Sequence, residues 1–217
     1  MKKHFKIAIQ MDPLEKINPN EDSTFVIAKE AQDRGYKIFH YLPKDISLKN
    51  NKIIARGSYF KIINSKKKFF KKEKKQSVSL NDFHCVLIRQ DPPFNMEYIT
   101  ATYFLEMLNK NVMVINNPTE IRNNPEKLSM FKFKNIIPQT LISKNLKEIK
   151  NFIKKNPFTI LKPMYGNGGE GIEKVKRGSL KNSKIINKMI KKYKGAIIVQ
   201  KFIKEIDKGD RRIILID

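Results

Sequence analysis

The sequence has one cysteine and no tryptophan, and it lacks any long apolar run. A single cysteine excludes an internal disulfide and is typical of a protein that works in the reducing cytoplasm. The longest apolar stretch, within residues 211–217, is strand-sized and far below the roughly 20 residues of a membrane-spanning helix. The first residues show neither an apolar signal-peptide core nor a cleavage site. We therefore expect a cytoplasmic protein with no membrane partner.

Acidic residues are scarce beside basic ones: 21 Asp and Glu face 45 Lys and Arg, which gives a formal net charge of +24. Such a charge indicates either a polyanionic partner, such as nucleic acid, or lysine-rich coding in an AT-rich genome. The lysines are spread along the chain and arginine is sparse, which favours the second explanation. The densest basic run, KKKFFKKEKK at 66–75, has aromatics that could stack on bases, but we interpret it as a solvated loop beside an edge strand.

The first half of the chain opens with a strand, a helix and a strand, the pattern of a parallel α/β sheet. Asp22 or Ser23 is placed to cap the first helix, and Gly35 to end it. Later apolar runs complete a first domain that ends near residues 117–118. The expected elements are strands at 5–11, 36–41, 85–89 and 112–115, short antiparallel strands around the turn at 50–51 within 46–64, and helices at 24–31 and 95–109.

The second half has a different pattern, with short helices first and antiparallel strands afterwards. Pro125 is expected to break the helical stretch at 118–130. The further expected elements are strands at 139–143, 158–162, 171–175, 196–203 and 211–216, and helices at 146–153 and 179–193.

A candidate phosphate site lies in residues 160–169, ILKPMYGNGG, where a strand-end lysine precedes a glycine-rich loop. Glycines let backbone N–H groups approach phosphate oxygens, and a lysine adds a fixed cation. The spacing is not that of Walker A and no helix follows directly, which argues against a P-loop fold. A glycine hairpin alone also fits a plain β-turn; the preceding lysine makes phosphate binding the better interpretation. The candidate residues are Lys162, Gly166, Asn167, Gly168 and Gly169.

Two more segments could contact a nucleotide. Gln200, Lys201, Phe202 and Ile203 end an expected strand, and a polar residue followed by apolar ones could pair with the edge of adenine. An ordinary strand end explains this segment equally simply. Lys127, after an Asn-Asn-Pro turn, offers a second lysine for phosphate and is otherwise a surface lysine.

Arg89 lies at the C-terminal end of an expected sheet strand, where ligand sites of α/β sheets form, so it is a candidate for contacting a substrate carboxylate. A structural ion pair with Asp91 or Asp12 explains it as well. The three histidines do not cluster in the sequence, and His84 and Cys85, as strand neighbours, face opposite ways. We therefore assign no metal ligand and no catalytic residue.

Taken in order, the candidate lysines, glycine loop and strand end make the sequence similar to the ATP-grasp ligases. Further blocks make it resemble one family of these, the prokaryotic glutathione synthetases, in one collinear order over essentially the whole chain. The blocks at 9–13 and 89–94 are far more specific than the glycine loop. The blocks are IQMDP at 9–13, DSTF at 22–25, AQDRGY at 31–36, RQDPPF at 89–94, ATY at 101–103, NNP at 116–118, NPEKL at 124–128 and GDRR at 209–212.

The resemblance implies an α/β fold in three parts. A Rossmann-like pre-ATP-grasp (substrate) domain would span residues 1–120, and an α+β lid or central subdomain of the ATP-grasp fold would span 121–204. Residues 205–217 would hold only the first strand of the C-terminal subdomain.

The resemblance also implies a reaction. ATP phosphorylates the C-terminal carboxylate of γ-glutamylcysteine, and the amine of glycine then attacks the acyl phosphate, giving glutathione, ADP and phosphate. In this family pattern Lys127 and Lys162 would hold phosphates, and residues 166–169 would form the lid hairpin. Residues 200–203 would line adenine, and Asp210 could meet the ribose.

Two departures from the family pattern matter. Family members usually carry a lysine where this chain has Gln90, which puts a substrate contact at that position in question. The family also continues past Asp217 with the Mg²⁺ ligands, so we expect this chain to be C-terminally incomplete and to have little ligase activity alone. The alternatives are another ATP-grasp amino-acid or peptide ligase, a non-enzymatic nucleic-acid binder and a regulatory remnant. A homo-oligomer is left open.

Overall fold

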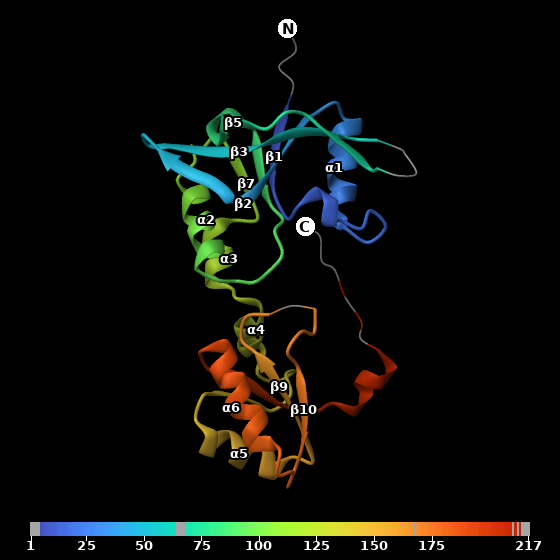
Figure 1. Ribbon diagram of the computed structural model, residues 1–217, viewed down its shortest axis with the longest axis vertical. Helices are drawn as coiled ribbons and strands as arrows, with labels where there is room; N and C mark the ends of the chain where they lie inside the picture. Colours follow the sequence, from blue (N-terminus) through green and yellow to red (C-terminus); the bar gives the residue numbers. More distant parts are fainter. Residues whose placement is uncertain (1–4, 64–67, 167, 210, 212, 214–217) are drawn as a thin grey trace. The chain divides into compact units, whose positions relative to one another are not determined.

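The computed structural model describes residues 5–63, 68–166, 168–209, 211 and 213. It divides into two compact units, Met1–Pro125 and Glu126–Asp217, which are described separately (Figure 1). None of the described helices combines the length and the apolar character that a membrane span requires. The division at residue 205 expected from the sequence stays a prediction.

The first unit is built on a mixed sheet in the order β4-β3-β2-β1-β6-β7, with β5 paired to β3. The inner strand β1 runs parallel to β2 and β6, and β6 runs parallel to β7, whereas β2 to β5 pair antiparallel. The strands are β1 (Lys6–Gln10), β2 (Lys37–Lys49), β3 (Lys52–Ile62), β4 (Phe70–Lys72), β5 (Gln76–Ser79), β6 (Cys85–Ile88) and β7 (Met113–Ile115). The expected parallel opening of the sheet is confirmed.

Helices cover this sheet because its central strands are apolar on both faces. Residues of β1 alternate between two cores, with Ala8 in one and Ile9 in the other. Asp22 caps the first helix as predicted, since its carboxylate accepts from the N–H groups of Thr24 and Phe25. The helices are η1 (Leu14–Lys16), α1 (Ser23–Asp33), η2 (Leu80–Asp82), α2 (Met96–Glu106) and α3 (Pro118–Asn123).

Two expectations for this unit are corrected. The antiparallel strands expected around the turn at 50–51 are confirmed, but they are long instead of short: β2 and β3 make one hairpin whose turn residues, Asn50 and Asn51, have φ of 49° and 57°. The basic run at 66–75 is not wholly a loop, because residues Phe70–Lys72 pair with β3 as the edge strand β4. Phe70 is partly buried against the core instead of being displayed for base stacking.

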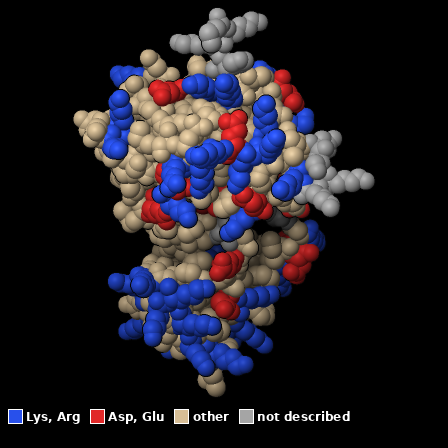
Figure 2. Space-filling view, turned by 45° about the horizontal axis from the view of Figure 1, so that its top comes forward, with Lys and Arg blue, Asp and Glu red and all other residues tan. Residues whose placement is uncertain are grey.

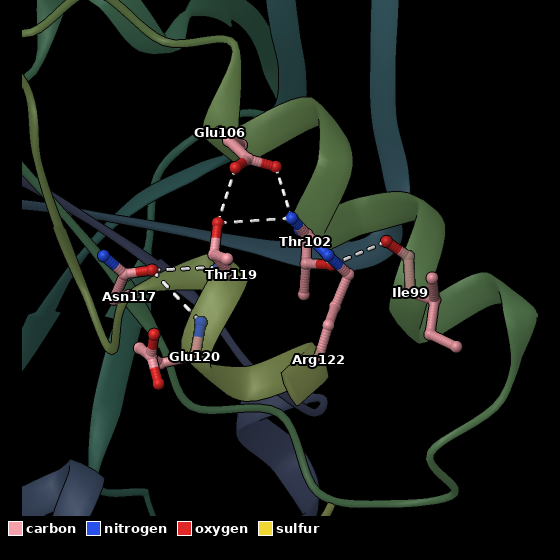
Figure 3. Close-up of polar contacts among 7 residues, drawn as sticks. All are labelled: Ile99, Thr102, Glu106, Asn117, Thr119, Glu120 and Arg122. Carbon is pink, nitrogen blue, oxygen red and sulfur yellow. Dashed lines mark hydrogen bonds and ion pairs between the residues drawn. The ribbon is translucent and has the colours of Figure 1, made fainter. Parts of the chain in front are cut away.

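A polar cluster joins α2 to α3 (Figure 3). The guanidinium of Arg122 forms an ion pair with Glu106 and donates from Nη1 to the hydroxyl of Thr102 at 3.1 Å. The carboxylate of Glu106 also accepts from the hydroxyl of Thr119. Arg122 lies 4.2 Å from the ring centroid of Tyr103, so the cluster fixes α3 by charge and stacking together.

The second unit is an antiparallel sheet in the order β10-β9-β11-β8 with α5 and α6 packed on one face. Apolar residues of the helices and strands, among them Ile149, Leu161 and Ile186, form the core on that face. The elements are α4 (Glu126–Ser129), η3 (Met130–Phe133), β8 (Thr140–Ser143), α5 (Leu146–Lys155), β9 (Phe158–Pro163), β10 (Glu173–Lys176), α6 (Asn182–Tyr193), β11 (Ile197–Lys201) and η4 (Lys204–Lys208).

The expected helix break at Pro125 is confirmed, because α3 ends at Asn123 and α4 begins at Glu126. The strand expected at 211–216 falls mostly outside the described residues, and Arg211 and Ile213 are not in a strand.

On the face that Figure 2 shows, acidic side chains are interspersed among the basic ones over the first unit. This mixture weakens the case for a polyanion-binding surface there.

Candidate functional site

The candidate site of the second unit lies on the sheet face opposite α5 and α6. Successive strand residues point to opposite faces, so the core positions Leu161 and Val199 direct their neighbours Lys162 and Gln200 to the other side. The strand register also places Lys162 and Gln200 on the same face. Lys162 lies opposite Ile198, and Ile198 is two residues before Gln200 on β11. Strand alternation thus brings a predicted cation and a predicted adenine contact onto one surface.

Lys162 is a partly buried cation with a neutral partner. Its Nζ donates to Oε1 of Gln200 at 2.9 Å, and Gln200 is only 8% exposed. Burial lowers the pKa of Lys162 below its ordinary value, and the positive charge of Lys127 lowers it further. Both causes oppose the charged form, so a bound anion would be stabilising at this position.

Lys127 supplies the second positive charge. It lies on the short helix α4, and its Nζ donates to the main-chain carbonyl of Pro163 at 2.9 Å. Burial lowers the pKa of Lys127, and the charge of Glu126 partly offsets that effect. Within the described part of the chain, neither this lysine nor Lys162 forms an ion pair with a carboxylate. Two cations held by neutral oxygens are the donor set of an anion site.

The glycine loop begins next to these lysines. A Cβ at Gly166 would lie 3.1 Å from Cγ of Pro163 and 3.9 Å from Nζ of Lys127, so the loop backbone passes close to the ammonium group. Gly168 and Gly169 have φ of 56° and 75°, the left-handed region that glycine adopts without strain. Asn167 lies outside the described residues. The structure therefore brings Gly166 close to Lys127, and the role of Lys127, Lys162 and Gly166 in holding a phosphate stays a prediction.

The end of β11 has its own contacts. Nζ of Lys174 lies 3.6 Å from the ring centroid of Phe202, and the ring of Phe158 stands 6.2 Å from that of Phe202. Lys201 and Ile203 are exposed. The assignment of residues 200–203 to adenine stays a prediction, as does that of Asp210, which lies outside the described residues.

Arg89 lies in a separate polar pocket of the first unit. Its Nε donates to the hydroxyl of Thr24 at 3.0 Å and its Nη2 to the hydroxyl of Ser23 at 2.7 Å. No ion pair joins Arg89 to Asp12 or Asp91 in the described chain, so the purely structural ion pair is not what the structure shows. The pocket has a volume of about 470 Å³.

This pocket forms where β1, β6 and the start of α1 meet. The main-chain N–H of Asp91 donates to the carboxylate of Asp12 at 2.8 Å, which ties the ends of the two strands together. Burial, followed by the charges of Asp12 and Asp22, raises the pKa of Asp91. Gln90 is buried and accepts a hydrogen bond from the amide of Gln10, so its side chain belongs to the interior of the sheet.

Sequence reasoning missed three hydroxyl-bearing residues of these sites. Thr140 lies opposite Gln200 on β8, and its hydroxyl accepts from the Gln200 amide at 2.9 Å. Ser23 and Thr24 hold Arg89 from the first turn of α1. The alternation of strand residues allows the face of Thr140 to be predicted, but the strand order that places it beside Gln200 has no local signal.

Comparison with known proteins gives two matches that together cover most of the chain. Residues 5–122 match the prokaryotic glutathione synthetase N-terminal domain, and residues 126–217 match the prokaryotic glutathione synthetase ATP-grasp domain. The glutathione synthetase of Agrobacterium fabrum is 38% identical over 217 residues, covering 100% of this chain and 68% of that protein. That of Buchnera aphidicola subsp. Baizongia pistaciae is 40% identical over 213 residues, covering 97% and 66%.

Solved structures show the fold alone. The D-cycloserine synthetase DcsG superposes with a TM-score of 0.60 at 13% identity, over 94% of this chain and 61% of that one. The D-alanyl-alanine synthetase A of Vibrio cholerae gives a TM-score of 0.58 at 12% identity, again over 94% and 61%. The chain spans about two thirds of the length of the relatives and structures it matches. The ATP-grasp part of the predicted fold is confirmed.

Proposed function

This chain belongs to the prokaryotic glutathione synthetase family, and from that premise we propose that it serves the ATP-dependent joining of γ-glutamylcysteine and glycine. The observation that carries the proposal is the pair of ammonium groups, Lys127 and Lys162, held beside a glycine loop by neutral oxygens only. In this proposal the second unit binds ATP and the first binds the dipeptide.

The residues of the second unit fit the phosphates of a nucleotide. The ammonium groups of Lys127 and Lys162 are donors with positive charge, and Gly166 allows the backbone close approach. When bound, ATP supplies the phosphoryl group that turns a carboxylate oxygen into a leaving group. The protein's part is to hold charge in place, because positioned cations in a water-poor site stabilise charge on a transferring phosphoryl group.

The residues of the first unit fit a substrate carboxylate. Arg89 donates to two hydroxyl groups that fix its plane, and its guanidinium retains further N–H donors for a ligand. The first N–H groups of α1 are already bound by the carboxylate of Asp22, so the positive charge that this part of the pocket offers an anion comes from Arg89. We assign to Arg89 a carboxylate of γ-glutamylcysteine.

Mg²⁺ is not placed by the described residues. They contain no group of three or more His, Cys, Asp or Glu side chains arranged around a common point. The proposal locates the reaction in the cytoplasm, which suits the free, buried thiol of Cys85.

Calorimetric titration of the 217-residue chain with a non-hydrolysable ATP analogue and, separately, with γ-glutamylcysteine tests the proposal. Lys162→Met should weaken nucleotide binding at least about tenfold and leave dipeptide binding unchanged, whereas Arg89→Met should do the reverse. Other dipeptides serve as controls for a different ligase specificity. Tighter binding of a dipeptide that lacks the γ-glutamyl group would contradict the assigned substrate. Nucleotide affinity unaffected by Lys162→Met would contradict the assigned phosphate site.

A further inference from the structure

Lys162 is held by a row of polar groups that crosses three neighbouring strands. We propose that Thr140 is a positioning residue for nucleotide binding: acting through the amide of Gln200, it fixes the ammonium of Lys162. The inference rests on the proposed function for the role of Lys162, but the arrangement itself is a property of the unliganded chain. Thr140 and Gln200 would not touch the phosphates themselves.

The strand register places the three side chains in one line. Thr140 of β8 lies directly opposite Gln200 of β11, and Lys162 of β9 lies opposite Ile198, two residues earlier on the same strand. Residues directly opposite and diagonal across antiparallel strands share a face and come within side-chain reach. The row is therefore built into the order β9-β11-β8 of the sheet.

Each hydrogen bond in this row has a fixed donor and a fixed acceptor. The hydroxyl of Thr140 donates its one proton to the main-chain carbonyl of Pro138 at 2.7 Å. Its oxygen is then an acceptor for the NH₂ of Gln200 at 2.9 Å, which turns the amide oxygen of Gln200 towards Lys162. An ammonium can only donate, so this is the one amide orientation that satisfies both neighbours.

Removing the Thr140 hydroxyl would release that orientation. The NH₂ of Gln200, which is buried, would lose its acceptor, so the amide would no longer be held against turning. In the turned orientation two donors would face each other, and the ammonium of Lys162 would lose its acceptor. The charged form of Lys162 would be disfavoured and its position would no longer be fixed.

The test measures two quantities on the full chain: the pKa of Lys162, by NMR of ¹³C-dimethylated lysines, and the affinity for ATP relative to adenosine. Thr140→Val should lower the pKa of Lys162 and weaken ATP binding about fivefold to tenfold, a larger factor than for adenosine, which lacks the phosphates. Thr140→Ser restores the hydroxyl and should restore both values, which loss of packing alone would not explain.

A matched control is Thr159→Val. Thr159 is a buried threonine of β9 on the helix-covered face, and its hydroxyl has no partner among the described residues. This variant should leave the pKa of Lys162 and the ATP affinity as they are. Gln200→Met gives a second route if Thr140→Val folds poorly: it should lower the pKa of Lys162 by a similar amount, and the double variant should add nothing further.

The outcomes separate this inference from the proposed function. If Thr140→Val leaves both the pKa of Lys162 and the ATP affinity at wild-type values, the inference is overturned and the phosphate site stands. If the wild-type chain binds no ATP, the proposed function fails, and the pKa of Lys162 in the Thr140 variants still decides whether the row holds the ammonium.

Discussion

The ammonium of Lys127 donates to the main-chain carbonyl of Pro163 at 2.9 Å, and Pro163 directly follows Lys162 on β9. This contact brings two positive charges from different elements to the same end of one strand. Like charges repel, so their proximity is stable only where neutral acceptors hold each ammonium or an anion lies between them. The two lysines are therefore electrostatically coupled, and the coupling can be measured.

Replacing Lys127 should raise the pKa of Lys162. The charge of Lys127 lowers that pKa in the native chain, so Lys127→Met removes a repulsion and leaves only the effect of burial. NMR of ¹³C-dimethylated lysines reads the change directly. Lys127→Arg keeps the charge and should leave the pKa of Lys162 nearly unchanged. An identical Lys162 titration in the Met and Arg variants would show that the two lysines do not interact.

The Arg122 cluster should account for a measurable part of the stability of the first unit. The side chain of Arg122 is 13% exposed and contacts Glu106 and Thr102 (Figure 3). It also stacks on the ring of Tyr103. We expect Arg122→Met to lower the free energy of unfolding by about 1–3 kcal/mol, because it leaves the buried hydroxyl of Thr102 without its donor. Urea denaturation followed by circular dichroism measures it.

The control for that prediction is an exposed pair. Arg34 and Glu30 form an ion pair on the surface of α1, with side chains 62% and 60% exposed. Arg34→Met should change the free energy of unfolding much less than Arg122→Met does. Equal losses in the Arg122 and Arg34 variants would contradict a special role for the cluster between α2 and α3.

Gly57 should not tolerate a side chain. A Cβ at this position of β3 would lie 2.0 Å from the carbonyl oxygen of His40 on the paired strand β2. Because that atom belongs to the backbone, Gly57→Ala should destabilise the first unit by about 1–3 kcal/mol in urea unfolding. Gly195→Ala is the matched variant, since its Cβ would meet only Tyr193 at 3.7 Å, and it should be close to neutral. A neutral Gly57→Ala would show that β2 and β3 separate easily at this point.

Acidification should weaken the first unit through His40. Burial lowers the pKa of His40 more than its hydrogen bond to the carbonyl of Asp12, at 3.0 Å, raises it, so the fold favours the neutral ring. The unfolded chain binds its proton near pH 6.5, before the folded chain does, so stability is complete above that pH and falls below it. The urea midpoint of the first unit should be lower at pH 5.5 than at pH 7.5. The difference between the two midpoints should be smaller in His40→Gln. Equal pH dependence in both proteins would rule out this cause.

The sequence predicts local structure well where a side chain reports on its own backbone. Asp22 caps α1, and Gly35, with φ of 78°, follows the helix, because both signals act within a few residues. Lys162 was likewise identified from its position at a strand end. Pairing between distant segments could not be predicted in this way. Residues Phe70–Lys72 form an edge strand because β3 offers free backbone groups to pair with. The charge pattern of the segment does not reveal that pairing.

The same limit on prediction from sequence applies to both candidate sites. Arg89 was predicted as a ligand contact or an ion pair, and the hydroxyls that hold it instead lie 65 and 66 residues away in the chain. Thr140 lies 60 residues from Gln200, and its part in holding Lys162 depends on strand order rather than on any motif. Partners that distant follow from topology, so they emerged only with the sheet register.

The central claim is that Lys127 and Lys162 hold the phosphates of ATP, and the ratio of ATP affinity to adenosine affinity tests it most directly. Calorimetry or equilibrium dialysis on wild type, Lys127→Met, Lys162→Met and the double variant gives that ratio. We predict that each single substitution lowers ATP affinity at least about tenfold while adenosine affinity stays constant. An unchanged ratio in the double variant would contradict the account.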